Sequence, residues 1–110
     1  MKVDTTLVGR KIVCLESCAS TNDEAWRLAL DGAPSGTVVF AEEQTKGRGR
    51  FGRTWVAPVG GCLLCSTILS EAVDVERVPL VTAVAALAIA DAVAQEAQIV
   101  FPNDVYVGGK

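Results

Sequence analysis

Eight residues, from Gly47 to Thr54, place three glycines and three arginines in one short segment, and this segment limits the folds open to the chain. It follows residues 37–41, an apolar run of the kind that forms a strand. Glycine tolerates backbone angles that other residues avoid, which favours an irregular loop here. Each guanidinium offers a planar fork of donors that matches phosphate or carboxylate oxygens. The segment therefore predicts a strand followed by a mobile loop that binds an anion.

The charge balance favours a compact anionic ligand over a nucleic acid. The chain has ten Lys and Arg residues against thirteen Asp and Glu residues. Four of the basic residues lie together: Lys46, Arg48, Arg50 and Arg53. The rest of the surface is strongly acidic and would repel a polyanion. A short RNA-binding segment, with Phe51 and Trp55 as stacking surfaces, stays an alternative.

The glycine spacing Gly47-x-Gly49-x-x-Gly52 also occurs in dinucleotide-binding proteins, where a helix follows it. Residues 53–61 contain proline and glycine and do not supply a helical run, so we reject that interpretation. The chain has no histidine, which excludes a Ser-His or Cys-His nucleophile pair. Its chemistry must depend on positioning and electrostatics, as in the activation of a carboxylate by a nucleoside triphosphate.

Length and composition predict one small globular domain, because 110 residues with 50% hydrophobic content can bury a core. No apolar stretch resembles a signal peptide or approaches the roughly 20 residues that span a bilayer, so we expect a cytoplasmic protein. The cysteines are expected to be buried, reduced thiols. A strand over residues 62–69 would turn Cys62 and Cys65 to opposite faces, which argues against a zinc site.

The patterns predict a short strand over residues 11–15 and a helix that begins after a polar cluster at residues 17–22. Ser20 or Thr21 would cap this helix, and Asp23 and Glu24 would be acids in its first turn, which the helix dipole favours. Asp31-Gly32-Ala33-Pro34 would end it. Its apolar face would consist of Ala25, Trp26, Leu28, Ala29 and Leu30.

Two more strands are predicted over residues 37–43 and 62–69. Pro79 suits the first turn of a second helix, which would reach Ala97 and, being apolar on nearly every side, would lie buried against a sheet. Two short strands, 99–101 and 105–107, flank a polar corner at residues 102–104. A glycine turn follows at Gly108-Gly109.

Three motifs together resemble the biotin–protein ligases, which attach biotin to carboxylase carrier domains. The motifs are Ser20-Thr21-Asn22, the segment from Ala41 to Trp55, and Pro102-Asn103-Asp104. The resemblance implies an α+β fold with a mixed, largely antiparallel sheet and helices packed on one face, similar to class II aminoacyl-tRNA synthetases and biotin–lipoate ligases. Residues 1–110 would form a single partial domain that lacks its C-terminal half.

The resemblance also implies roles for individual residues. Biotin would be bound by Ser20, Thr21, Asn22, Gln44, Arg48, Gly49 and Arg50. The catalytic residues would be Arg48, Arg50 and Arg53. ATP and the adenylate would contact Arg48, Arg50, Arg53, Trp55, Asn103 and Asp104. Leu63 and Leu64 would form an apolar wall, and no residue is singled out as a metal ligand. Biotin and ATP would be substrates, with Mg²⁺, and the loop would order over biotinyl-5'-AMP to exclude water.

The partner implied by the resemblance is a biotin carboxyl carrier protein domain, whose lysine receives the biotin. No DNA or membrane is expected as a partner, and a homodimer is compatible with the resemblance.

The chain departs from the usual family pattern at two places. Val100-Phe101 replaces the Lys-Trp that usually precedes Pro-Asn-Asp, and the chain stops at Lys110, before the lysine that the family uses. A lipoate or octanoyl ligase relative, or an inactive truncated ligase-like binding module, are the alternatives.

Overall fold

The structure is a computed structural model that describes residues 5–70, 74–93, 96–100 and 103–109. The chain divides into two compact units, Met1–Glu71 and Ala72–Lys110, and each is described by itself. The first unit contains β1 (Ile12–Cys18), α1 (Thr21–Leu30), β2 (Val38–Gln44), the 3₁₀ turn η1 (Arg50–Gly52) and β3 (Leu64–Thr67). The second contains the 3₁₀ turn η2 (Val75–Arg77), α2 (Val78–Ala92), β4 (Ala97–Val100) and β5 (Asp104–Val107).

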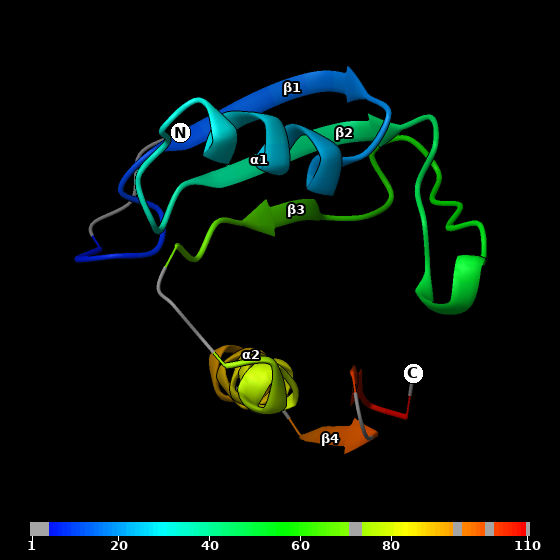
Figure 1. Cartoon of the computed structure of the whole chain (residues 1–110). Helices are drawn as coiled ribbons and strands as arrows, with labels where there is room; N and C mark the ends of the chain where they lie inside the picture. The colour runs from blue at the N-terminus through cyan, green and yellow to red at the C-terminus, as the bar shows by residue number, and fades with distance from the viewer. Residues whose placement is uncertain (1–4, 71–73, 94–95, 101–102, 110) are drawn as a thin grey trace. The chain divides into compact units, whose positions relative to one another are not determined.

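The first unit is a three-stranded sheet with α1 packed on one face (Figure 1). The central strand β2 pairs in parallel with β1 and antiparallel with β3. Its Val39 is completely buried and forms a small core with Ala25 of α1 and Ile68, which follows β3. These contacts fix α1 against the sheet, so that the first turn of the helix lies near the end of β2.

Helix α1 begins and ends where the sequence predicts. The Ser20 hydroxyl accepts a hydrogen bond from the Asn22 amide, and Gly32 follows the helix with a φ of +92°. The predicted apolar face is only partly right, because Trp26 and Leu30 are 70% and 75% exposed. A helix on one face of a sheet buries only a stripe of positions three and four apart, and here that stripe runs through Ala25, Leu28 and Ala29.

The strand boundaries differ from the predicted ones at two places. Strand β1 continues to Cys18, well past the predicted end, because β2 supplies a parallel partner along its whole length. Strand β3 covers only Leu64–Thr67 instead of residues 62–69. Before it, Gly60 adopts a φ of +73° and the Gly61 amide bonds to the Pro58 carbonyl, so the chain is still in a turn when it reaches Cys62.

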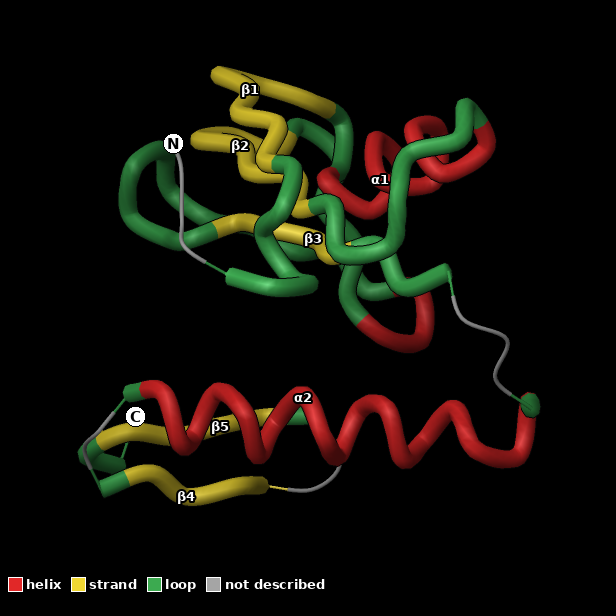
Figure 2. The backbone as a smooth tube through the Cα atoms, turned by 90° about the vertical axis from the view of Figure 1, so that its left-hand side faces the viewer, coloured by secondary structure: helices red, strands yellow, loops and turns green. Residues whose placement is uncertain are grey.

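In the second unit, α2 lies along the antiparallel hairpin of β4 and β5 (Figure 2). Pro79 is in the first turn of α2, as predicted. The hairpin around the polar corner is also confirmed, although Phe101 and Pro102 lie outside the described residues. Gly108 and Gly109 form the predicted turn with positive φ angles.

The predictions of the end and the burial of α2 were wrong. The helix ends at Ala92, and Ala97 is already the first residue of β4. Ala86 is the one buried residue of α2. The side chains of Leu80, Val84 and Leu87 are 62%, 64% and 59% exposed. Two strands of four residues cover little of a helix that is apolar on nearly every side.

Candidate functional site

The glycine–arginine segment folds into a small hairpin rather than an open loop. The Trp55 amide donates to the Gly47 carbonyl at 2.8 Å, and the Gly49 amide donates to the Arg53 carbonyl at 2.7 Å. The turn η1 forms its tip, where Phe51 and Gly52 have φ angles of 59° and 73°. No helix follows in residues 53–61, which agrees with the rejection of a dinucleotide-binding loop.

Gly47 is the position in this hairpin where a side chain has no room. A Cβ atom there would lie 2.7 Å from the Trp55 carbonyl oxygen and 3.1 Å from the Gln44 Nε2 atom. At Gly49, by contrast, the nearest atom would be Arg53 Cβ at 3.5 Å, an ordinary contact. The hairpin therefore returns close to the end of β2, and it brings Trp55 and Gln44 together.

One cavity of about 270 Å³ joins the predicted motifs of the first unit. It lies between the start of α1, the end of β2, the hairpin and the start of β3. Its lining residues are Ser20, Thr21, Asn22, Gln44, Arg48, Trp55, Cys62, Leu63, Leu64, Cys65 and Ser66. The structure thus brings together the Ser-Thr-Asn motif, the glutamine, the first arginine of the hairpin and the tryptophan.

A hydrogen-bond network orders the polar end of this cavity. Gln44 Oε1 accepts from the Thr21 amide at 2.7 Å and from the Thr21 hydroxyl at 3.0 Å. Ser66 Oγ lies 2.8 Å from the Thr21 hydroxyl and donates to Asn22 Oδ1. Within the described residues, both hydrogen bonds of the Gln44 side chain use its oxygen, Oε1. Its two amide N–H groups, and those of Asn22, are therefore suited to donate to a carbonyl of a ligand.

Arg48 lines the same cavity and makes a two-pronged ion pair with Asp23 of α1. Nη1 donates to Oδ2 at 3.0 Å and Nη2 donates to Oδ1 at 2.5 Å. The hydrogen bonds from Arg48 hold the pKa of the Asp23 carboxyl below its usual range, and Asp23 raises the pKa of the guanidinium further. Both groups are thus fully charged at neutral pH.

Other predicted site residues are not in the cavity lining. Arg50 stacks over the Phe51 ring at 4.9 Å at the tip of the hairpin, and Arg53 follows that tip. Gly49 is also absent from the lining. Asn103 and Asp104 belong to the second unit, so their part in a shared site remains a prediction.

Sequence reasoning missed the partners of two predicted site residues, Asp23 and Ser66, and it did not place Cys62 or Cys65 in the cavity. Asp23 was interpreted only as an acid in the first turn of a helix, and its partner is 25 positions away. Ser66 was interpreted only as part of a strand. The alternation of strand side chains could have identified it, because Ser66 lies two residues after the buried Leu64 and two residues before the core residue Ile68.

Comparison with known proteins decides the family. The sequence profile of the biotin/lipoate A/B protein ligase family matches residues 14–110. The chain belongs to this family. The bifunctional ligase/repressor BirA of Bacillus subtilis is 34% identical over 96% of this chain and 34% of its own length. The biotin–[acetyl-CoA-carboxylase] ligase of Mycobacterium tuberculosis is 36% identical over 92% of this chain and 42% of its own length.

A solved structure agrees with the family assignment. The biotin protein ligase from Aquifex aeolicus, in complex with biotin and ATP, has a TM-score of 0.65 and 33% identity over 88% of this chain and 41% of that chain. The resemblance to biotin–protein ligases and the predicted α+β fold class are thereby confirmed. This chain spans about a third of the length of the first of these two curated relatives and about two fifths of the second.

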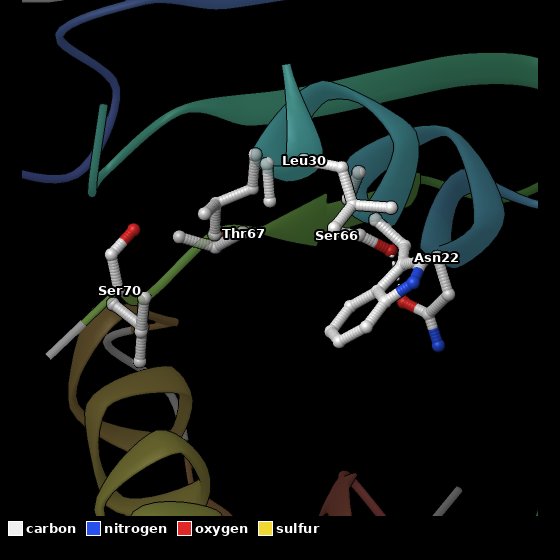
Figure 3. Close-up of a pocket in the computed structure, with 10 residues that line it drawn as sticks. Asn22, Leu30, Ser66, Thr67 and Ser70 are labelled. Atoms are coloured by element: carbon white, nitrogen blue, oxygen red, sulfur yellow. Dashed lines mark hydrogen bonds between the residues drawn. The ribbon is translucent and has the colours of Figure 1, made fainter. Parts of the chain in front are cut away.

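A second hollow is larger than the candidate cavity, but Arg48 does not line it. It has a volume of about 600 Å³ and lies between α1 and β3 (Figure 3). Asn22 and Leu30 line it from the helix, and Ser66, Thr67 and Ser70 line it from the strand side. We prefer the smaller cavity as the candidate site, because its polar groups converge on one point and include a cation.

The four cysteines are free, as predicted, but none of them is buried, contrary to the prediction. Cys14, Cys62 and Cys65 are exposed, and Cys18 is intermediate. The predicted strand alternation does not extend to Cys62, because Cys62 precedes β3; both Cys62 and Cys65 line the candidate cavity. Within the described residues, no group of three or more His, Cys, Asp or Glu side chains could hold a metal ion. The same part of the chain has no helix long and apolar enough to cross a membrane.

The two cavity cysteines give a direct probe of occupancy. Partial desolvation raises the pKa of the Cys65 thiol, so its alkylation by iodoacetamide should level off at a higher pH than that of a small-molecule thiol of ordinary pKa. Saturating biotin should slow alkylation of Cys62 and Cys65, as followed by mass spectrometry of the peptides. Cys14, outside the cavity, is the control; equal protection there would argue against a local effect.

Proposed function

We propose that this chain supplies the biotin-binding and phosphate-binding part of a biotin–protein ligase. The observation that carries the proposal is the single cavity shared by Ser20, Thr21, Asn22, Gln44 and Arg48. Its lining offers amide and hydroxyl groups together with one guanidinium. Biotin has the matching chemistry, since its ureido ring is polar and neutral while its tail ends in a carboxylate.

In this proposal the polar network orients the ureido ring. Asn22 and Gln44 donate to the ring carbonyl, and the hydroxyls of Ser20 and Thr21 complete the polar end. Leu63 and Leu64 form the apolar wall beside the tetrahydrothiophene ring and the tail; Leu64 is buried, whereas Leu63 is 77% exposed. Such a site fixes a small ligand by a few convergent polar groups in an apolar pocket.

The proposed reaction has two steps. The biotin carboxylate oxygen attacks the α-phosphorus of ATP, the bond to the leaving phosphate breaks, and pyrophosphate departs. The amine of a lysine on a biotin carboxyl carrier protein then attacks the acyl carbon, AMP leaves, and an amide bond and a proton result. Arg48 offsets the charge of the carboxylate and of the phosphoryl oxygens, with Arg50 and Arg53 from the same hairpin and Trp55 beside the adenine.

The nucleotide side of this proposal includes Asn103 and Asp104 of the second unit. Mg²⁺ commonly enters such sites bound to the triphosphate and to one or two carboxylates. The described residues hold no cluster that would bind the ion by protein groups alone, and we assign it no step. Attack on ATP needs no general base, because the carboxylate is already a nucleophile. A cytoplasmic location remains part of the prediction.

Calorimetry on the 110-residue chain tests the proposal. Biotin is expected to bind, and lipoate and octanoate are expected not to. Addition of ATP should then release pyrophosphate, and biotin binding without pyrophosphate release would point to a binding module that lacks turnover. Binding of lipoate or octanoate in place of biotin would transfer the chain to the other branch of the family, and no binding of any of them would refute the proposed site.

A further inference from the structure

The fork of Arg48 is already filled in the ligand-free structure. Both terminal nitrogens of its guanidinium donate to the two carboxylate oxygens of Asp23, at 3.0 and 2.5 Å. This is the pairing that a guanidinium makes with any carboxylate, including that of a ligand. A second carboxylate cannot use the same pair of donors at the same time.

Asp23 is positioned to act on the candidate cavity without lining it. It follows Asn22, which lines the cavity, and its partner Arg48 lines it from the hairpin. The pair joins the first turn of α1 to the glycine–arginine hairpin across 25 positions of sequence. Any ligand that draws Arg48 toward the cavity therefore also loosens this link between helix and hairpin.

The pair is suited to be broken by a ligand. The Arg48 and Asp23 side chains are 57% and 48% exposed, so that solvent and salt screen their attraction. Once released, Asp23 remains favourably placed, because it lies in the first turn of α1 and is stabilised by the positive end of the helix dipole. The helix thus provides Asp23 with a favourable environment in either state.

We propose that Asp23 is an affinity-setting residue of the site: its carboxylate occupies Arg48 until the carboxylate of the ligand displaces it. This inference rests on the proposed function, since it takes biotin as the ligand. Asp23 competes for the guanidinium and makes biotin binding weaker than the cavity alone would allow. It acts through Arg48 and does not touch the ligand.

Asp23→Asn tests the inference by calorimetry of the 110-residue chain at pH 7. The variant keeps the shape of the side chain and removes its charge. Biotin is expected to bind about two- to fivefold more tightly, which corresponds to the strength of an exposed ion pair. Biotinamide, which has no carboxylate, is expected to bind the variant and the wild type equally.

Glu24→Gln is the matched control, because it removes the same charge from the same helical turn. Glu24 pairs with Arg27 on its own helix, outside the cavity, and its replacement should leave biotin affinity unchanged. Unchanged or weaker biotin binding by Asp23→Asn would overturn the inference, as would equal tightening by Glu24→Gln. Failure of the wild-type chain to bind biotin would instead refute the proposed function, and these results are distinguishable.

Discussion

Replacement of Arg48 by alanine is expected to slow formation of the biotinyl-adenylate by about 100-fold or more. Arg48 is the one arginine of the hairpin that lines the candidate cavity, and it lies beside the polar network of Thr21 and Gln44. Without it, the carboxylate and the phosphoryl oxygens would meet in a pocket with no nearby cation among its lining residues. Pyrophosphate release in the presence of biotin and ATP measures the effect.

Arg27→Ala provides the control for Arg48→Ala. Arg27 is also an exposed arginine in a two-pronged ion pair with an acid, but its partner Glu24 lies on the same helix and neither lines the cavity. Its replacement should change the rate by less than about twofold. Where the chain binds biotin without turnover, biotin affinity is the readout, and Arg48→Ala should lower it at least about tenfold. Normal rates and normal affinity in Arg48→Ala would remove this residue from the site.

Local patterns predicted the elements of the first unit well because their signals are local. The cap at Ser20, the glycine after α1 and the apolar run of β2 each depend on a few adjacent residues. The ends of β1 and β3 were wrong because pairing partners set them: β2 supports β1 to Cys18, and a turn at Gly60 and Gly61 delays β3. Strand length is a property of two strands, and one strand alone does not reveal it.

In the candidate site, too, the features with a local signal were predicted and those that depend on distant residues were not. The sequence indicated an anion-binding segment from its glycines and arginines, and the resemblance added the polar residues of the first helix. It did not indicate Asp23 as the partner of Arg48, because an acid in a first helical turn is already explained by capping. Nor did it separate Arg48 from Arg50 and Arg53. Their places differ because the hairpin turns at η1, which directs Arg50 onto Phe51.

Gly47→Ala is expected to weaken biotin binding by about 5- to 150-fold, the effect of about 1 to 3 kcal/mol of overpacking. The added Cβ would lie 2.7 Å from the Trp55 carbonyl oxygen, where the Gly47 carbonyl also accepts the Trp55 amide. Main chain cannot move aside as the end of a flexible side chain can. The hairpin would therefore open at its base. Arg48 and Trp55, which both line the cavity, would then be displaced from their positions in it.

The comparison with Gly49→Ala separates this mechanism from a general effect of losing a glycine. Gly49 has a φ of −97°, which alanine adopts, and its added Cβ would meet Arg53 Cβ at an ordinary 3.5 Å. Its effect on biotin affinity, measured by calorimetry, should stay within about threefold, since the main effect is a lower entropy of the unfolded chain, which slightly stabilises the fold. Equal losses in the two variants would show that the close approach of Gly47 to Trp55 does not hold the cavity together. A loss confined to Gly47→Ala would mean that the glycine at the base of the hairpin, rather than those near its tip, sets the position of Arg48.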